Sequence, residues 1–189
     1  MTGSYSRFLR FGTALVAILL LSNVVAIAGS YAATRDPQEY FFQQSFGDLR
    51  EELQTAKQDG KKALLIMFDN ADCPWCLKMK TTILNQVEVQ DYFRKHFQII
   101  EIDTEGSKPV INFDGKQYLE KDFTLILNRV RATPVFIFFD LNGKQIVRHT
   151  GTVRDQAEFM WLGEFVVGEH YKTKRFAVYK RERMAAIGK

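Results

Sequence analysis

The stretch Asp72-Cys73-Pro74-Trp75-Cys76-Leu77-Lys78 decides the fold, because it holds both cysteines of the chain and separates two segments of different pattern. Before it, Lys62 to Phe68 is a short apolar run bounded by polar residues, which predicts a buried strand. After it, Cys76, Met79 and Ile83 recur at helical spacing, with polar residues between them. The stretch is therefore predicted to join a strand to an amphipathic helix.

The first cysteine is expected at the amino end of that helix. Pro74 suits the first turn, because the amide that proline lacks would have had no partner inside the helix. Unpaired amides and the positive pole of the helix dipole stabilise a thiolate there, so Cys73 is predicted to be the exposed nucleophile. Cys76 lies almost one turn on, can reach the same sulfur, and can close a reversible disulfide with it.

The alternative reading of a Cys-x-x-Cys pair is half of a zinc site. A closed structural zinc site needs about four ligands. The chain has no further cysteine, and its three histidines, His96, His149 and His170, are scattered. No metal site is predicted.

A second motif lies far downstream, Ala132-Thr133-Pro134-Val135-Phe136-Ile137-Phe138-Phe139. Together with the strand, Cys-Pro-Trp-Cys and helix, it resembles the two signatures of the thioredoxin superfamily over roughly residues 41 to 168. The resemblance implies an α/β fold whose central mixed sheet of about four strands is flanked by helices. It also implies a cis bond between Thr133 and Pro134, in a loop that lies against the active-site disulfide and, with Pro74 and Trp75, shapes the site.

Within the superfamily, a finer likeness rests on Phe46-Gly47-Asp48-Leu49, on Gly60-Lys61-Lys62 and on the tail of the chain. These segments resemble the exported thioredoxins that accompany bacterial sulfur-oxidation (Sox) systems.

The middle of the chain predicts a parallel strand pair and an insertion. Val87 to His96 has a helical pattern and Phe97 to Asp103 that of a second strand, so strand, helix and strand form a right-handed crossover. Two alternating runs around Asp114-Gly115 then predict a β-hairpin after the second strand. Residues 120–129 are predicted to form a helix with Phe123, Ile126 and Leu127 inward.

The last part of the domain predicts a hairpin, a helix and an added helix. The apolar run Val135 to Phe139 suits a central strand, and a tight turn leads to an antiparallel strand over 145–150. Asp155 to Val167 is expected to form the closing amphipathic helix. Residues 169–184 are predicted to form an extra C-terminal helix.

The first 33 residues are predicted to be a signal peptide. Arg7 and Arg10 precede an uncharged run that ends in small residues, and both Ala26-Ile27-Ala28 and Ser30-Tyr31-Ala32 offer a cleavage pattern. The alternative is an uncleaved N-terminal membrane anchor, because the apolar core approaches the length that spans a bilayer. Residues 34–189 are then a single domain in the periplasm, free or anchored to the inner membrane.

The net charge of +4 is concentrated at the end of the chain. From Lys172 onward there are seven basic residues and one acidic residue, Glu182, while the rest of the exported domain is acidic. A nucleic-acid site would need a basic patch over the domain face, so nucleic acid is excluded. The tail, from about residue 169, is either a solvated helix face or a docking surface for an anionic partner or lipid.

The proton acceptor of the dithiol is an open question. Typical thioredoxins carry a buried aspartate six residues before the first cysteine, opposite a lysine on the neighbouring strand. Here Met67 holds that position and the strand 97–103 has no lysine. Asp69, Asp72 and Glu101 are candidates for proton transfer or charge tuning, as is Lys78 for charge tuning, although each carboxylate is expected to be exposed or to end a strand.

The predicted function is thiol-disulfide exchange on protein disulfides, with Cys73 attacking and Cys76 resolving and with no cofactor beyond the disulfide. A reducing or isomerising direction is favoured, because threonine precedes proline in the Thr133-Pro134 pair and because strong oxidants of the superfamily often place histidine where Trp75 stands. The expected partners are protein thiols and a membrane electron donor of the Dsb type, with the protein itself a monomer. Two alternatives are a copper or cytochrome-assembly thiol chaperone and a non-catalytic adaptor with the same fold.

Overall fold

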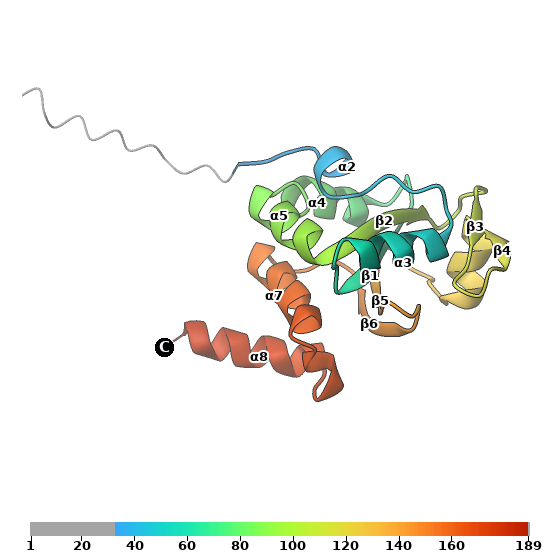
Figure 1. Cartoon of the computed structure of the whole chain (residues 1–189). Coiled ribbons are helices and arrows are strands. Elements are labelled where there is room, and N and C mark those ends of the chain that lie inside the picture. Colours follow the sequence, from blue (N-terminus) through green and yellow to red (C-terminus); the bar gives the residue numbers. More distant parts are fainter. Residues whose placement is uncertain (1–32, 189) are drawn as a thin grey trace, which may run out of the picture. The chain divides into compact units, whose positions relative to one another are not determined.

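The computed structural model describes residues 33–188, so the predicted export segment lies outside it except for Ala33. In these residues a four-stranded sheet has the strand order β2-β1-β5-β6 (Figure 1). The strands are β1 (Ala63–Asp69), β2 (Phe97–Asp103), β5 (Val135–Phe139) and β6 (Gln145–Thr150). β1 and β2 are parallel, and the other two pairings are antiparallel. The predicted mixed sheet is confirmed.

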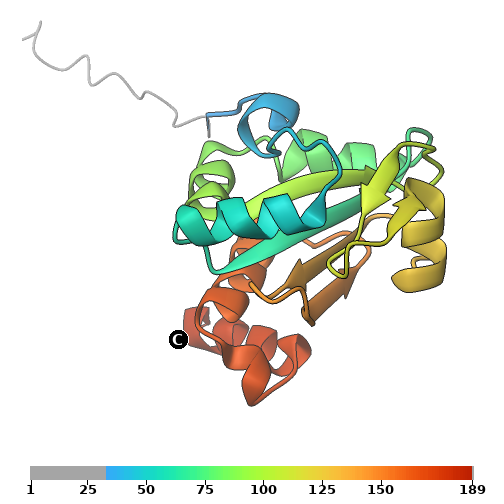
Figure 2. The ribbon, with the colours of Figure 1, turned by 45° about the vertical axis from the view of Figure 1, so that its right-hand side comes forward.

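The two central strands are buried on both faces. Every residue of β1 and of β5 is buried, which explains why their sequences are continuous apolar runs rather than alternating ones. One face packs against α3 (Leu49–Gln58), and the other packs against α4 (Pro74–Thr82), α5 (Val87–His96) and α7 (Gln156–Val167). Figure 2 shows α3 crossing its face of the sheet. Within residues 33–188, no helix has both the length and the apolar character needed to cross a bilayer.

Aspartate side chains fix the starts of two of these helices. Asp48 accepts a hydrogen bond from the amide of Arg50 at 2.9 Å, and Asp155 accepts one from the amide of Glu158 at 2.9 Å. Such caps satisfy amides that have no partner inside the helix. The segment before α3 holds a short helix, α2 (Pro37–Tyr40).

The predicted insertion after β2 is a separate two-stranded hairpin of β3 (Pro109–Ile111) and β4 (Gln117–Leu119). Gly47, in the turn before α3, ties this hairpin to the domain. Its carbonyl oxygen accepts a hydrogen bond from the Ile111 amide at 2.8 Å, and its φ of 86° lies in the left-handed region that favours glycine. A Cβ added at Gly47 would also meet the carbonyl oxygen of Pro109.

Gly47→Ala is expected to lower the free energy of unfolding by about 3 kcal/mol, because a left-handed alanine costs about 1 kcal/mol and the clash with Pro109 adds to it. Gly60→Ala is the matched control, since Gly60 also has a positive φ, of 66°, but has open space around it. Denaturant unfolding of both variants measures the difference. Equal losses would show that the contact with the hairpin carries no stability.

The helix predicted over 120–129 is irregular. It divides into α6 (Glu120–Asp122) and a π-helical turn, η1 (Phe123–Leu127), whose Phe123 carbonyl accepts from the Asn128 amide at 3.1 Å. Phe123 is buried as predicted. The inward placement of Ile126 and Leu127 is wrong, because they are 63% and 40% exposed. A π-turn adds a residue per turn and so rotates later side chains off the expected face.

The C-terminal addition is a 3-10 turn, η2 (His170–Lys172), followed by α8 (Phe176–Ile187), which packs on α7. Tyr179 is its one buried residue. Four basic side chains of the tail pair with carboxylates: Lys172 with Glu169, Lys174 with Glu182, Lys180 with Glu158 and Arg183 with Glu164. Pairing of this kind fits a solvated helix face better than a docking surface.

Candidate active site

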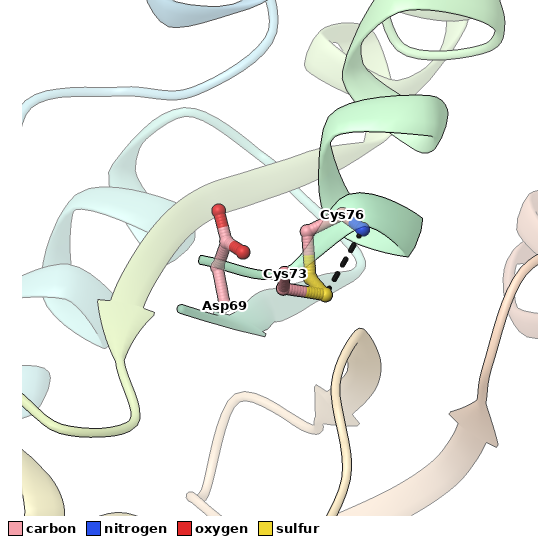
Figure 3. A group of neighbouring side chains, drawn as sticks. All are labelled: Asp69, Cys73 and Cys76. Atoms are coloured by element: carbon pink, nitrogen blue, oxygen red, sulfur yellow. Dashed lines mark hydrogen bonds between the residues drawn. A yellow bond between two sulfur atoms is a disulfide. The ribbon is translucent and has the colours of Figure 1, made fainter. Parts of the chain in front are cut away.

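The two cysteines form a disulfide at the start of α4. Cys73 is the N-cap residue and Pro74 follows it in the first turn, as the sequence predicts. The Cα atoms are 5.3 Å apart, and the Cys76 amide donates to the Cys73 sulfur at 3.1 Å (Figure 3). Cys76 is only 1% exposed, whereas Cys73 is half-buried. Cys73 is therefore the sulfur that another molecule can approach, and a helix amide points at it.

The loop before β5 lies at the same end of the sheet. Phe68 pairs with Val135, so Pro134 stands beside the end of β1, from which the chain continues to Cys73. The bond between Thr133 and Pro134 is cis, as the resemblance implies. Within residues 33–188, no backbone hydrogen bond joins Ala132 or Thr133 to another residue. The loop thus presents free amide and carbonyl groups at the end of β1 that leads to the dithiol.

A cavity of about 320 Å³ opens beside this loop. Asn70, which precedes the dithiol loop, lines it together with Thr133 and Leu125 of η1. Leu125 is 54% exposed, and so are other apolar side chains of this end of the molecule, Trp75 at 57% and Leu77 at 62%. The surroundings of Cys73 therefore combine free backbone groups with exposed apolar side chains.

A carboxylate lies next to the sulfurs. An oxygen of Asp69 and the sulfurs of Cys73 and Cys76 are all within 4.8 Å of one another. Figure 3 shows the three side chains together at the start of α4. Asp69 ends β1, as predicted, but it is only 6% exposed, so the expectation of an exposed carboxylate is wrong for it. The reason is that Lys80 of α4 pairs with Asp69 and supplies the compensating charge.

Lys80 also joins Asp69 to Glu101 on β2, because its Nζ lies 2.6 Å from an oxygen of Glu101. Burial raises the pKa of Glu101, and a hydrogen bond with Asp69 raises it further. Burial acts to lower the pKa of Lys80, but the hydrogen bonds to Asp69 and Glu101 outweigh it and raise that pKa. The structure thus brings together Asp69 and Glu101, and adds Lys80, one of the polar residues between the apolar positions of α4.

The other predicted charged residues stand apart from this cluster. Lys78 places its Nζ 5.6 Å from the ring centroid of Trp75. Asp72 is exposed, and its amide donates to the Asn70 side chain at 2.8 Å. Within residues 33–188, neither Asp72 nor Lys78 forms a salt bridge.

Solved structures share the fold. A thioredoxin-fold protein from Helicobacter pylori superimposes with a TM-score of 0.61 over 82% of this chain and 98% of that one, at 16% sequence identity. The structure of a DsbH oxidoreductase gives a TM-score of 0.52 over 71% of this chain and 87% of that one, at 23% identity. Identities this low support a common fold alone.

Sequence comparison adds a curated relative and a family. The disulfide bond reductase DsbH of Chlamydia pneumoniae is 30% identical over 99 residues, which cover 52% of this chain and 57% of the relative. The chain thus spans little more than half the length of that relative. Residues 49–166 match the model of the thioredoxin-like domain, and with the Cys73–Cys76 disulfide at its expected place this chain belongs to the thioredoxin-like family.

Proposed function

We propose that this protein is an exported thiol-disulfide oxidoreductase that reduces or isomerises disulfides of other proteins. The observation that carries the proposal is the asymmetry of the two cysteines: Cys73 is approachable at a helix start, and Cys76 is buried within reach of it. Similarity to a disulfide bond reductase supports the same chemistry.

The proposed cycle begins with reduced protein. The Cys73 thiolate attacks one sulfur of a substrate disulfide, forms a mixed disulfide and releases the other substrate sulfur as a thiolate. Cys76 then attacks the Cys73 sulfur, closes the intramolecular disulfide and releases the second substrate thiol. Two electrons pass to the substrate, and a dithiol of a donor protein must return them by the reverse exchange. No other cofactor takes part in this cycle.

Asp69 is proposed as the proton acceptor. Cys76 must lose its proton before it attacks, and burial disfavours its thiolate. The Asp69 carboxylate lies within 4.8 Å of the sulfurs. It takes the proton from Cys76, becomes a carboxylic acid, and later releases the proton to water. General bases of this kind contribute about 10² to 10⁴ in rate.

Unfolded or extended polypeptide is the substrate form that fits this surface. The free backbone groups of Ala132 and Thr133 can pair with an extended segment next to the target cysteine. The cavity beside Thr133 and the exposed Trp75 can receive its side chains. These contacts position a substrate sulfur near Cys73.

The cellular setting is proposed from the sequence. Arg7, Arg10 and the apolar run after them support export, free or anchored. No glutathione buffer holds the bacterial periplasm, so a membrane electron donor of the Dsb type is the expected source of reducing equivalents. A role beside sulfur-oxidation enzymes stays a prediction of the finer sequence likeness.

Equilibration against glutathione buffers tests the direction. The Cys73–Cys76 couple is expected at a midpoint potential below about −180 mV, with reduced protein cleaving insulin disulfides and a Cys73→Ser/Cys76→Ser variant inactive. A midpoint near about −120 mV would reject a reducing role. Tight stoichiometric copper binding without insulin reduction would favour the chaperone alternative instead.

A further inference from the structure

Lys80 joins the buried carboxylates at the dithiol. It stands four residues after Cys76, so both side chains lie on one face of α4. Its ammonium lies between Asp69 at the end of β1 and Glu101 on β2. The side chains of Lys80 and Asp69 are 20% and 9% exposed, so their charges interact much more strongly than on an open surface.

The segment before α3 closes over this group. Gln38 of α2 donates to an oxygen of Glu101 at 3.0 Å, and the ring of Phe42 lies 5.9 Å from the Lys80 ammonium. Lys80 thus contacts residues of β1, of β2 and of the segment before α3.

The other charged groups that face the cluster lie around one cavity of about 240 Å³, which Asp69, Lys80 and Glu101 also line. These groups are Asp103 of β2, Lys108 of the insertion and Glu120 of α6. The sulfurs of Cys73 and Cys76 lie within 4.8 Å of an oxygen of Asp69, which is one of the residues that line this cavity. The cavity gives water a route to the carboxylates.

Two carboxylates this close together cannot both be ionised unless a cation compensates them. Lys80 is the cation in contact with both. Without it, Asp69 and Glu101 would compete for a single proton, so Asp69 would be an ionised base for a smaller part of the time and would take the proton of Cys76 more slowly.

We propose that Lys80 is the positioning residue of the dithiol, which holds Asp69 as a carboxylate directed at the sulfurs so that Asp69 can deprotonate Cys76. This rests on the proposed exchange cycle. Glu101 anchors Lys80, and its own negative charge limits how strongly Lys80 acts on Asp69. In the step itself, the proton moves from the Cys76 sulfur to Asp69, and the thiolate then attacks Cys73 and expels the substrate thiolate.

The test measures the release of nitrothiobenzoate when the reduced protein is mixed with the small disulfide dithiobis(nitrobenzoate). The release is expected in two kinetic phases. The first nitrothiobenzoate is released when Cys73 attacks, and the second when Cys76 resolves the adduct. Lys80→Met is expected to raise the pH midpoint of the second phase by about one unit and to slow it about tenfold at neutral pH. Lys80→Arg keeps the positive charge and is expected to restore most of the rate.

Glu101→Gln is expected to shift the pH midpoint of the second phase in the opposite direction, to a lower pH. Without the negative charge of Glu101, the full positive charge of Lys80 acts on Asp69. Lys57→Met on α3 is the control, an exposed lysine whose loss should change neither phase. A Lys80→Met midpoint equal to that of the wild type would overturn the proposal, and so would shifts of the same sign in Lys80→Met and Glu101→Gln. Failure of the proposed function looks different: both phases would be normal while insulin stayed unreduced.

Discussion

Cys73→Ser is expected to reduce the rate of insulin reduction to the uncatalysed background, while Cys76→Ser stops the reaction one step later. Serine at position 73 removes the approachable sulfur, and the 1% exposure of Cys76 leaves no second sulfur for the substrate. Serine at position 76 leaves the attack by Cys73 intact but removes the group that resolves the mixed disulfide. The Cys76 variant is therefore expected to accumulate a covalent adduct.

Insulin turbidity measures the first effect, and the mass of the non-reduced protein after incubation with a peptide disulfide measures the second. The adduct should disappear on treatment with dithiothreitol. Met184→Ser on α8 is a control with an exposed side chain remote in sequence from the dithiol, and full activity is expected for it. Residual turnover in Cys73→Ser, or no adduct in Cys76→Ser, would contradict the assigned roles.

Phe159→Ala is expected to lower the free energy of unfolding by about 3 to 5 kcal/mol. Phe159 of α7 is fully buried and stacks on Phe93 of α5, with 4.5 Å between the ring centroids. It also makes an edge contact with Phe136 of β5 at 5.3 Å. Removing the ring leaves a cavity where two helices meet the sheet, and the same cluster of side chains includes Cys76.

Guanidinium unfolding followed by circular dichroism measures this loss. Phe46→Ala is the matched control, because Phe46 is 87% exposed and its removal is expected to change stability by less than about 0.5 kcal/mol. Similar losses in the two variants would show that the aromatic cluster does not hold the helices on the sheet.

The fold could be predicted from the sequence because its central elements are strongly patterned. The buried run before Cys73 and the apolar run after Pro134 each match a strand to within a residue, as β1 and β5. The helix over Val87–His96 was predicted with its observed limits, since its apolar residues keep one period throughout. Periodicity of this kind is local and needs no knowledge of the neighbours.

The charge cluster could not be predicted in the same way, because its three members come from three elements. The sequence predicts an exposed or strand-ending carboxylate at Asp69; it does end β1, but pairing with Lys80 lets it be buried. One signal was present, the spacing of four between Cys76 and Lys80, which places the lysine on the face of the sulfur rather than on the wet face. The pairing with Glu101 depends on the register of β1 against β2, which aligns Met67 with Glu101.

The error at η1 has a different cause. Ile126 and Leu127 have the spacing of an inward helical stripe, and an α-helical period assigns them to the core. Hydrogen bonds that skip one more residue, as from Asn128 to Phe123, are not visible in a hydropathy pattern. The consequence is two exposed apolar side chains that directly follow Leu125, a residue that lines the cavity beside Thr133.

The ion pairs between α7 and α8 bear on where the folding unit of this protein stops. The shared family region ends at residue 166, yet Glu158 and Trp161, both nearly inaccessible to water, are covered by Lys180 and Arg183 from beyond that boundary. A polypeptide that ended at residue 166 would leave the Glu158 carboxylate without its counter-ion and expose the indole ring of Trp161. In this protein the folding unit therefore extends beyond the shared region and includes α8.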